Sequence, residues 1–190
     1  MRTVFAVTAL VAFGAVATAC NVASPFVIQD ALRDVSCTGT SCLPPSDRVF
    51  NDDIDMRRLT VVHGPTVKAN IRPELAAGSI AGWRDFADPI SFNVQIRVGP
   101  NGQYNVLVFG GGSVDPSRGL VLRYNGQPTG CAVSLVVNGA SSEYKVLVPR
   151  SCLGNPSAIA VSVTAVKYHD DAINGRDFAG DSNQFVDFAG

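Results

Sequence analysis

The chain lacks most of the sequence features that point directly to a biochemical activity. After its first segment it has no apolar run near the roughly 20 residues of a membrane-spanning helix. It has no Lys/Arg cluster of the kind that nucleic-acid-binding proteins carry, no C-x-x-C pair, no G-x-S-x-G motif and only two histidines. With a formal net charge of −1, these absences argue against nucleic acid as a partner and against zinc, redox or triad chemistry. We therefore expect a protein without a catalytic site.

The N-terminal segment has the composition of a signal peptide. A basic residue precedes an apolar run from Val4 to Ala17, and the small residues Ala17 and Ala19 form an A-x-A cleavage pattern. We expect residues 1–19 to be removed and the mature chain to be exported, either as an extracellular protein or on the outer face of the cell membrane. Cys20 follows this site directly, as the lipid-bearing cysteine of a bacterial lipobox does, although Ala17 stands where a lipobox favours leucine. The alternative is ordinary cleavage that leaves an N-terminal thiol.

Five cysteines are present, an odd number for an exported chain that uses disulfides in pairs. If Cys20 is lipidated, four remain, and they allow three pairings. We favour Cys37–Cys42, which closes a small polar loop. We pair Cys131 with Cys152, a bridge that stabilises a hairpin by about 3 kcal/mol on the chain-entropy model.

The second bridge depends on how the chain turns between its two cysteines. A two-residue turn at Asn138-Gly139 would place Cys131 opposite Val146 rather than Cys152. The bridge therefore requires a wider loop over residues 139–143, or a chain that doubles back after Pro149.

Alternation of apolar and polar residues predicts strands along most of the remaining chain. Val67, Ala69 and Ile71 alternate with polar neighbours, and Gly64-Pro65 separates them from the preceding apolar run, which predicts a hairpin over residues 55–72. A second predicted hairpin turns at Gly99-Pro-Asn-Gly102. Further strand-like runs cover residues 120–124, 131–138, 143–148 and 159–164.

About eight strands and no amphipathic helix predict an all-β fold. We expect a two-layer antiparallel β-sandwich, jelly-roll or immunoglobulin-like, over residues 49–190, with a closed barrel as the alternative. Residues 20–48 have little periodicity and are expected to form an irregular arm or tether, with the apolar piece from Phe26 to Leu32 docked on the body.

Three motifs carry a resemblance to a known group. They are Asp53-x-Asp-x-Arg-Arg-Leu-Thr-Val-Val-His-Gly64, Val98-Gly-Pro-Asn-Gly-Gln-Tyr-Asn-Val-Leu-Val108 and Pro149-Arg-Ser-Cys-Leu-Gly154. In this order, over about residues 50–168, the chain resembles uncharacterised exported proteins of actinobacteria. That group is similar to DOMON-like and carbohydrate-binding-like β-sandwiches. The resemblance implies the fold, export and the Cys131–Cys152 pairing, and it implies no particular activity.

Two acidic clusters are the candidate metal ligands. One precedes the first hairpin and the other follows the last strand, and in a sandwich these two places can lie at the same end. Calcium takes six to eight oxygen ligands, often carboxylates on loops. Calcium is therefore the one cofactor that we consider. The alternative is that both clusters lie on solvated loops and bind no metal. The candidate ligands are Asp52, Asp53, Asp55, Asp170, Asp171 and Asp177.

Trp83 and Phe86, in the long connection between the hairpins, are the candidate binding aromatics. We find no other row of aromatic residues that would serve as a platform for sugar rings. Phe178, Phe185 and Phe188 are expected to bring the tail back onto the body as an edge strand. The pattern favours an exported binding module whose partner is a protein or a glycan at the cell surface. A secreted hydrolase that uses loop carboxylates and a purely structural envelope protein are the alternatives.

Overall fold

The computed structural model of the protein describes residues 25–29, 55–73, 90–110, 120–138, 143–169 and 172–188. The predicted signal peptide, Cys20, the Cys37–Cys42 pair and the connection that contains Trp83 and Phe86 lie outside these residues. In the described part of the chain, no helix has the length and apolar character needed to cross a membrane.

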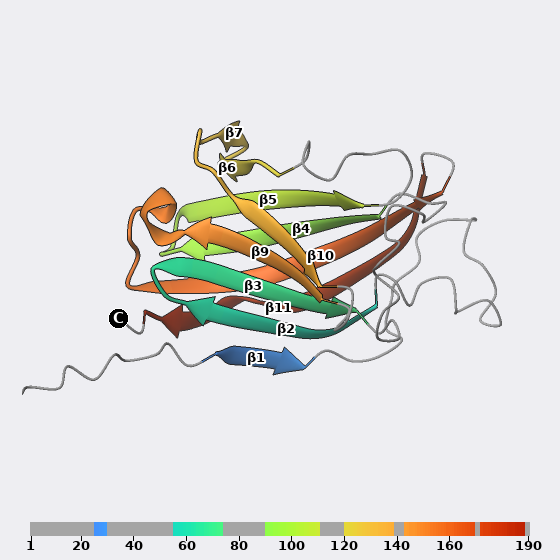
Figure 1. The fold of residues 1–190 in the computed structure, drawn as a ribbon, viewed down its shortest axis with the longest axis horizontal. Helices are drawn as coiled ribbons and strands as arrows, with labels where there is room; N and C mark the ends of the chain where they lie inside the picture. Colours follow the sequence, from blue (N-terminus) through green and yellow to red (C-terminus); the bar gives the residue numbers. More distant parts are fainter. Residues whose placement is uncertain are drawn as a thin grey trace, which may run out of the picture.

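Two antiparallel sheets lie face to face, and Figure 1 shows the five-stranded sheet in front of the six-stranded one. The five-stranded sheet has the order β1 (Phe26–Gln29), β2 (Met56–His63), β3 (Thr66–Pro73), β9 (Glu143–Pro149), β8 (Ser134–Asn138). The six-stranded sheet has the order β11 (Ala172–Asp187), β10 (Ala158–His169), β4 (Ile90–Val98), β5 (Gly102–Gly110), β6 (Leu122–Tyr124), β7 (Gln127–Pro128). The predicted two-layer antiparallel β-sandwich is confirmed.

The predicted turns join the strands that the sequence pattern places beside them. β2 pairs with β3 across Gly64-Pro65, and β4 pairs with β5 across the turn that begins at Gly99. Asn125 and Gly126, with φ values of 47° and 82°, turn β6 into β7. Two successive positive φ angles are the requirement of a type I′ turn, which asparagine and glycine meet at the lowest steric cost.

Side chains that point between the two sheets form the core. Their alternation with outward-facing residues is the period-two pattern expected of strands with one buried face. The aromatic rings of Phe92 and Tyr144, one from each sheet, meet with their centroids 4.8 Å apart. The buried core residues contributed by the longest strands are Leu59, Val61, Val67, Ile71, Phe92, Val94, Ile96, Val106, Val108, Tyr144, Val146, Val148, Ile159, Val161 and Val163.

The disulfide between Cys131 and Cys152 is formed, as predicted, with the two Cα atoms 5.9 Å apart. Asn138 pairs with Glu143, so the connection between β8 and β9 is a wide loop rather than a two-residue turn. After β9 the chain folds back through the 3-10 helix Arg150–Leu153 (η4). The wide loop and the return of the chain after Pro149, which the sequence offered as alternatives, are therefore both present.

The N-terminal arm contributes a strand of its own. Phe26–Gln29 forms β1, which pairs antiparallel with β2 at the edge of the five-stranded sheet. Phe26 and Ile28 turn toward the core, and Val27 and Gln29 turn outward. This piece of the arm, expected to be irregular but docked on the body, is therefore a regular part of the sandwich.

The tail forms β11, the edge strand of the six-stranded sheet, and it contains a large bulge. Ser162 pairs with Gly180, but Ala160 pairs with Phe185, so four residues of β11 lie opposite Val161 alone. The extra three residues are an odd number, and an odd shift of register reverses which face a side chain occupies. The bulge therefore turns Phe185 to the outer face of the sheet, the same face as Phe178.

Gly180 makes the bulge possible. Its φ is +94°, and a Cβ added there would lie 2.6 Å from the carbonyl oxygen of Val161. A real Cβ does not approach a carbonyl oxygen so closely, and a positive φ is costly for any residue with a side chain. Glycine is thus required both by the backbone conformation and by the contact with β10.

Candidate functional site

The structure places Asp177 of one acidic cluster at the start of β2, next to Asp55 of the other cluster. Asp55 and Asp177 are both buried, with 2% and 3% of their surfaces exposed. The carboxylate of Asp177 accepts a hydrogen bond of 2.6 Å from the backbone N–H of Met56, which fastens β11 of one sheet to β2 of the other. Asp177 therefore has a structural role at the junction of the sheets.

The other four candidate metal ligands, Asp52, Asp53, Asp170 and Asp171, lie outside the described residues. Among the residues that are described, no three His, Cys, Asp or Glu side chains are grouped so that they could hold a metal ion. The calcium site thus remains a prediction from the sequence.

A different set of polar side chains gathers on the outer face of the six-stranded sheet. Alternation along β4 turns Gln95 and Arg97 outward while their neighbours Val94 and Ile96 fill the core. The strand register then extends two polar rows across β5, β4 and β10. One row contains Asn105, Gln95 and Ser162, and the other contains Gln103, Arg97 and Ala160.

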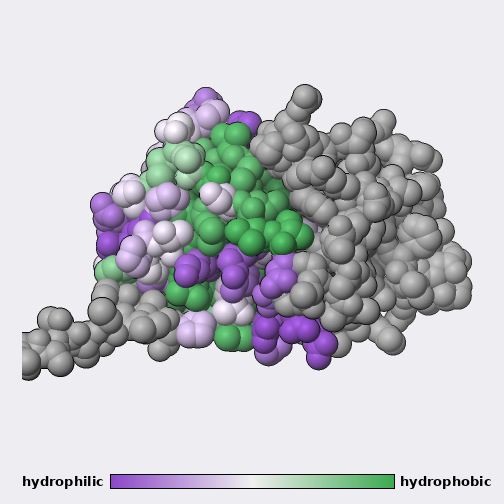
Figure 2. Space-filling model, in the orientation of Figure 1, coloured by the Kyte–Doolittle hydropathy of each residue, from purple (hydrophilic) through white to green (hydrophobic). Residues whose placement is uncertain are grey.

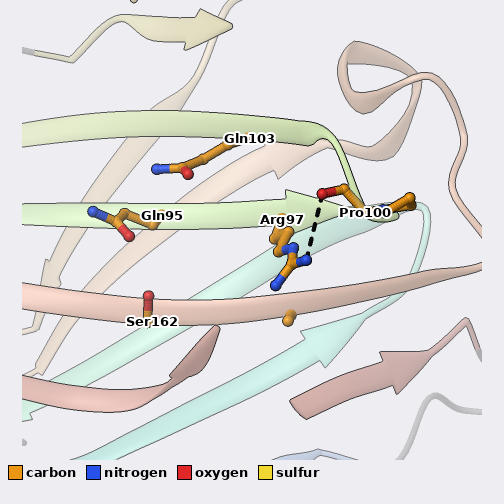
Figure 3. Close-up of a pocket in the computed structure, with 6 residues that line it drawn as sticks. Gln95, Arg97, Pro100, Gln103 and Ser162 are labelled. Carbon is orange, nitrogen blue, oxygen red and sulfur yellow. Dashed lines mark hydrogen bonds between the residues drawn. The ribbon is translucent and has the colours of Figure 1, made fainter. Parts of the chain in front are cut away.

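A pocket of about 220 Å³ opens on this face and is lined by Gln95, Arg97, Pro100, Gln103, Ala160 and Ser162. The shape of the pocket follows from the lengths of the side chains. The small residues Ala160 and Ser162 of β10, each 1% exposed, form its floor. The longer side chains of β4 and β5 surround this floor. Figure 3 shows the amide groups of Gln95 and Gln103 turned the same way on neighbouring strands, with the Ser162 hydroxyl turned toward the Gln95 side.

Arg97 is held in place by the β4–β5 turn. Its Nε donates to the carbonyl oxygen of Gly99 at 3.3 Å. Its Nη2 donates to the carbonyl oxygen of Pro100 at 3.4 Å, the bond drawn in Figure 3. The guanidinium carbon also lies 5.8 Å from the centroid of the Phe185 ring, within the range of a cation–π contact. The arginine therefore connects the polar rows to the aromatic edge of the sheet.

Two polar side chains in the rows, Ser162 and Gln103, have donors or acceptors that make no hydrogen bond within the described residues. The buried hydroxyl of Ser162 has no hydrogen-bond partner within the described residues, a situation that costs roughly 1–3 kcal/mol. The amide of Gln103 donates to the side-chain oxygen of Asn105 at 3.3 Å, which leaves the other Gln103 N–H and the carbonyl oxygen available. The pocket thus presents donors and acceptors to an incoming polar group.

Two phenylalanine rings border the polar rows along β11. Phe178 is 50% exposed and Phe185 is 40% exposed. They pair with Thr164 and Ala160, which are four residues apart on β10, so the two rings stand roughly 13 Å apart along the strand. The expectation that the tail returns to the body as an edge strand is confirmed, because β11 is the edge strand of the six-stranded sheet. The rings of Phe178 and Phe185 are exposed on its outer face.

A second cluster lies where the end of β11 meets the β2–β3 turn. His63 is 1% exposed, and its Nδ1 lies 3.0 Å from the Val186 carbonyl oxygen, to which it donates. Burial lowers the pKa of His63, so the imidazole is neutral at pH 7. The Phe188 ring meets it edge-on, and the guanidinium of Arg150 stacks on the Phe188 ring with 3.8 Å between its central carbon and the centroid. This stack packs the end of β11 against the β2–β3 turn and η4.

Comparison with known proteins assigns no family to this arrangement. No protein-family model matches the chain, and no curated protein matches it. The function therefore has to be argued from the geometry of the site.

Proposed function

We propose that the protein is an extracellular glycan-binding module and that its binding surface is the outer face of the six-stranded sheet. The observation that carries this proposal is the combination of two polar rows, a hollow with a buried hydroxyl that lacks a partner, and two exposed phenylalanine rings on the same face. We refer to this surface, made by Gln95, Arg97, Gln103, Asn105, Ser162, Phe178 and Phe185, as the amide face.

The polar rows fit the chemistry of a sugar. Each sugar hydroxyl both donates and accepts a hydrogen bond, and each carboxamide offers two N–H donors and one carbonyl acceptor. Gln95 and Asn105 are directly paired on neighbouring strands, which lie about 4.8 Å apart. Their amides can therefore contact adjacent hydroxyls of one ring, with the Ser162 hydroxyl below them as a further partner.

The exposed rings fit the other half of a sugar's surface. A pyranose carries C–H groups on its faces, and a flat aromatic ring offers a large apolar contact area at a small loss of side-chain entropy. Phe185 stands beside the pocket, whereas Phe178 stands roughly 13 Å further along β11. A ligand that contacts both rings must be longer than one sugar unit, which favours a polysaccharide chain lying along the edge of the sheet.

The predicted signal peptide and the predicted lipid on Cys20 support the extracellular location. Intact-mass measurement of the native protein tests this part independently of any ligand. We expect a mass that lacks residues 1–19 and carries a lipid adduct on Cys20. A lipid-free chain that retains residues 1–19 contradicts both predictions.

Affinity electrophoresis of the purified protein tests the glycan-binding proposal. Each gel contains one polysaccharide: a cellulose derivative, xylan, mannan, a soluble chitin derivative or starch. We expect one class of polysaccharide to retard the protein. The substitutions Phe185→Ala and Gln95→Ala should each weaken that retardation about ten-fold, as the loss of a central contact does in other interfaces. The matched control is Tyr124→Ala, which removes an exposed aromatic ring that stacks on Tyr104 away from the amide face.

Two results contradict the proposal. One is mobility that no polysaccharide of the panel changes. The other is retardation that Tyr124→Ala weakens as much as Phe185→Ala, because binding would then depend on exposed aromatic surface in general rather than on the amide face.

A further inference from the structure

The outer face of the five-stranded sheet carries a cluster of arginines on the side opposite the amide face. Arg58 of β2 and Arg72 of β3 are directly paired across the two strands, and Gln29 of β1 pairs with Arg58 on its other side. An irregularity in the register at the start of β2 leaves Arg57 exposed beside them. Together these four side chains line a pocket of about 160 Å³.

The arginines come from two different strands, so they form no basic cluster in the sequence. Lys68 of β3 and Lys145 of β9 belong to the same outer face. Among the described residues of that face, the only acidic side chain is Glu143, which meets Arg58 with 3.4 Å between Nη2 and Oε1. In a chain whose formal net charge is −1, this sheet face is therefore strongly positive.

Figure 2, which views this side of the molecule, shows hydrophilic side chains over β2 and β3 and a hydrophobic region over β8. The basic and apolar parts of the sheet face are thus separated. The arginine pocket lies at the β1–β2–β3 side of the sheet, away from the apolar strand.

Arg58 and Arg72 place two positive charges directly opposite each other, and the ion pair with Glu143 offsets the charge of Arg58 in part. Like charges placed directly opposite each other in a sheet repel, and no hydrogen bond or ion pair within the described residues holds Arg57 or Arg72. An anion in the pocket removes this repulsion. Guanidinium groups present two parallel N–H donors that match the two oxygens of a carboxylate or phosphate, so the best occupant is an oxyanion.

We propose that the pocket formed by Gln29, Arg57, Arg58 and Arg72 is a binding site for an oxyanion, the phosphate or carboxylate group of an extracellular polymer. The site is independent of the amide face, because it lies on the other sheet. Lys68 and Lys145 extend it along the strands and attract further anionic groups of the same polymer.

Isothermal titration calorimetry of the purified protein with three polymers tests this site: inorganic polyphosphate, polygalacturonate and neutral dextran. Titrations at about 50 mM and 200 mM salt give the slope of log K against log salt concentration, which reports the number of anionic contacts. We expect one of the two polyanions to bind, and dextran not to bind at this pocket. Which polyanion binds more tightly distinguishes a phosphate polymer from a carboxylate polymer.

The substitution Arg72→Gln should weaken polyanion binding about ten-fold, the value of one charge-assisted hydrogen bond, and reduce the salt slope by about one. Arg57→Gln should act in the same direction. The matched control is Arg123→Gln, which makes the same change of charge on β6 of the other sheet and should alter affinity less than two-fold. Arg72→Gln should also leave the melting temperature unchanged or higher, because it removes a repulsion; a structural arginine would lower it.

Three results overturn the proposal. They are the absence of binding to both polyanions, equal loss of affinity in Arg72→Gln and Arg123→Gln, and tighter binding to a short duplex DNA than to either polyanion. The last result would identify the face as a nucleic-acid-binding surface.

Discussion

Replacing Gly180 with alanine tests the bulge that turns Phe185 toward the amide face. The new Cβ would lie 2.6 Å from the Val161 carbonyl oxygen and 3.1 Å from a Leu59 methyl group, at a residue whose φ is +94°. The positive φ costs about 1–2 kcal/mol, and the forced contact costs about 1–3 kcal/mol more. We expect thermal unfolding, followed by circular dichroism, to show a destabilisation of about 2–5 kcal/mol.

Gly126→Ala separates these two contributions. Gly126 has a similar φ of +82°, but an added Cβ would meet no atom within 4 Å, so only the cost of about 1–2 kcal/mol for the backbone conformation applies. Gly180→Ala should therefore be the more damaging by at least about 1 kcal/mol, and it alone should weaken glycan binding. Equal destabilisation by the two substitutions would refute the close packing of β11 on β10, and unchanged glycan binding in Gly180→Ala would separate the bulge from the site.

Three further perturbations have signs that follow from the structure. Burial holds the pKa of His63 below its usual 6.5; the charge of Arg150 adds to this shift, and the Val186 hydrogen bond opposes it. As the pH falls, the unfolded chain therefore binds a proton at this histidine before the folded chain does. Stability to denaturant should be constant above pH 6.5 and fall below it, and His63→Gln should abolish the fall. Ser162→Ala removes a buried hydroxyl without a hydrogen-bond partner, so it should raise the free energy of unfolding by about 1 kcal/mol. The same substitution should weaken glycan binding. A loss of stability would show that the hydroxyl has a hydrogen-bond partner. Cys152→Ser breaks the Cys131–Cys152 bridge, which joins cysteines 21 residues apart. It should lower the free energy of unfolding measured in urea by about 3 kcal/mol. A change near zero would contradict the chain-entropy explanation.

The sequence predicts the elements whose pattern is local. The β2–β3 and β4–β5 hairpins follow from alternation of apolar and polar residues around Gly64-Pro65 and Gly99-Pro-Asn-Gly102, because one face of each strand is buried in the core. The Cys131–Cys152 bridge is one of the three pairings that four cysteines allow, and it is the pairing that the resemblance to exported β-sandwich proteins implies. The wide connection between β8 and β9 that it needs was left open by the sequence and is seen only in the structure.

The two proposed binding surfaces were not predictable in the same way. The amide face depends on the register of β5, β4, β10 and β11, which joins residues far apart in the chain, and on an odd-numbered bulge that no sequence alternation reveals. The arginine pocket depends on the pairing of Arg58 with Arg72. Acidic and aromatic residues that are close together in the sequence were the candidates that could be seen without the fold. Of these, only Asp55 and Asp177 are among the described residues.

The most direct test of the central claim is a titration of the isotope-labelled protein with an oligosaccharide of the polysaccharide that retards it, followed by backbone amide chemical shifts. We expect the largest shifts at Gln95, Arg97, Gln103, Ser162 and Phe185, on the outer face of the six-stranded sheet. Shifts that concentrate on the five-stranded sheet, or in the loops that join the strands, would contradict it.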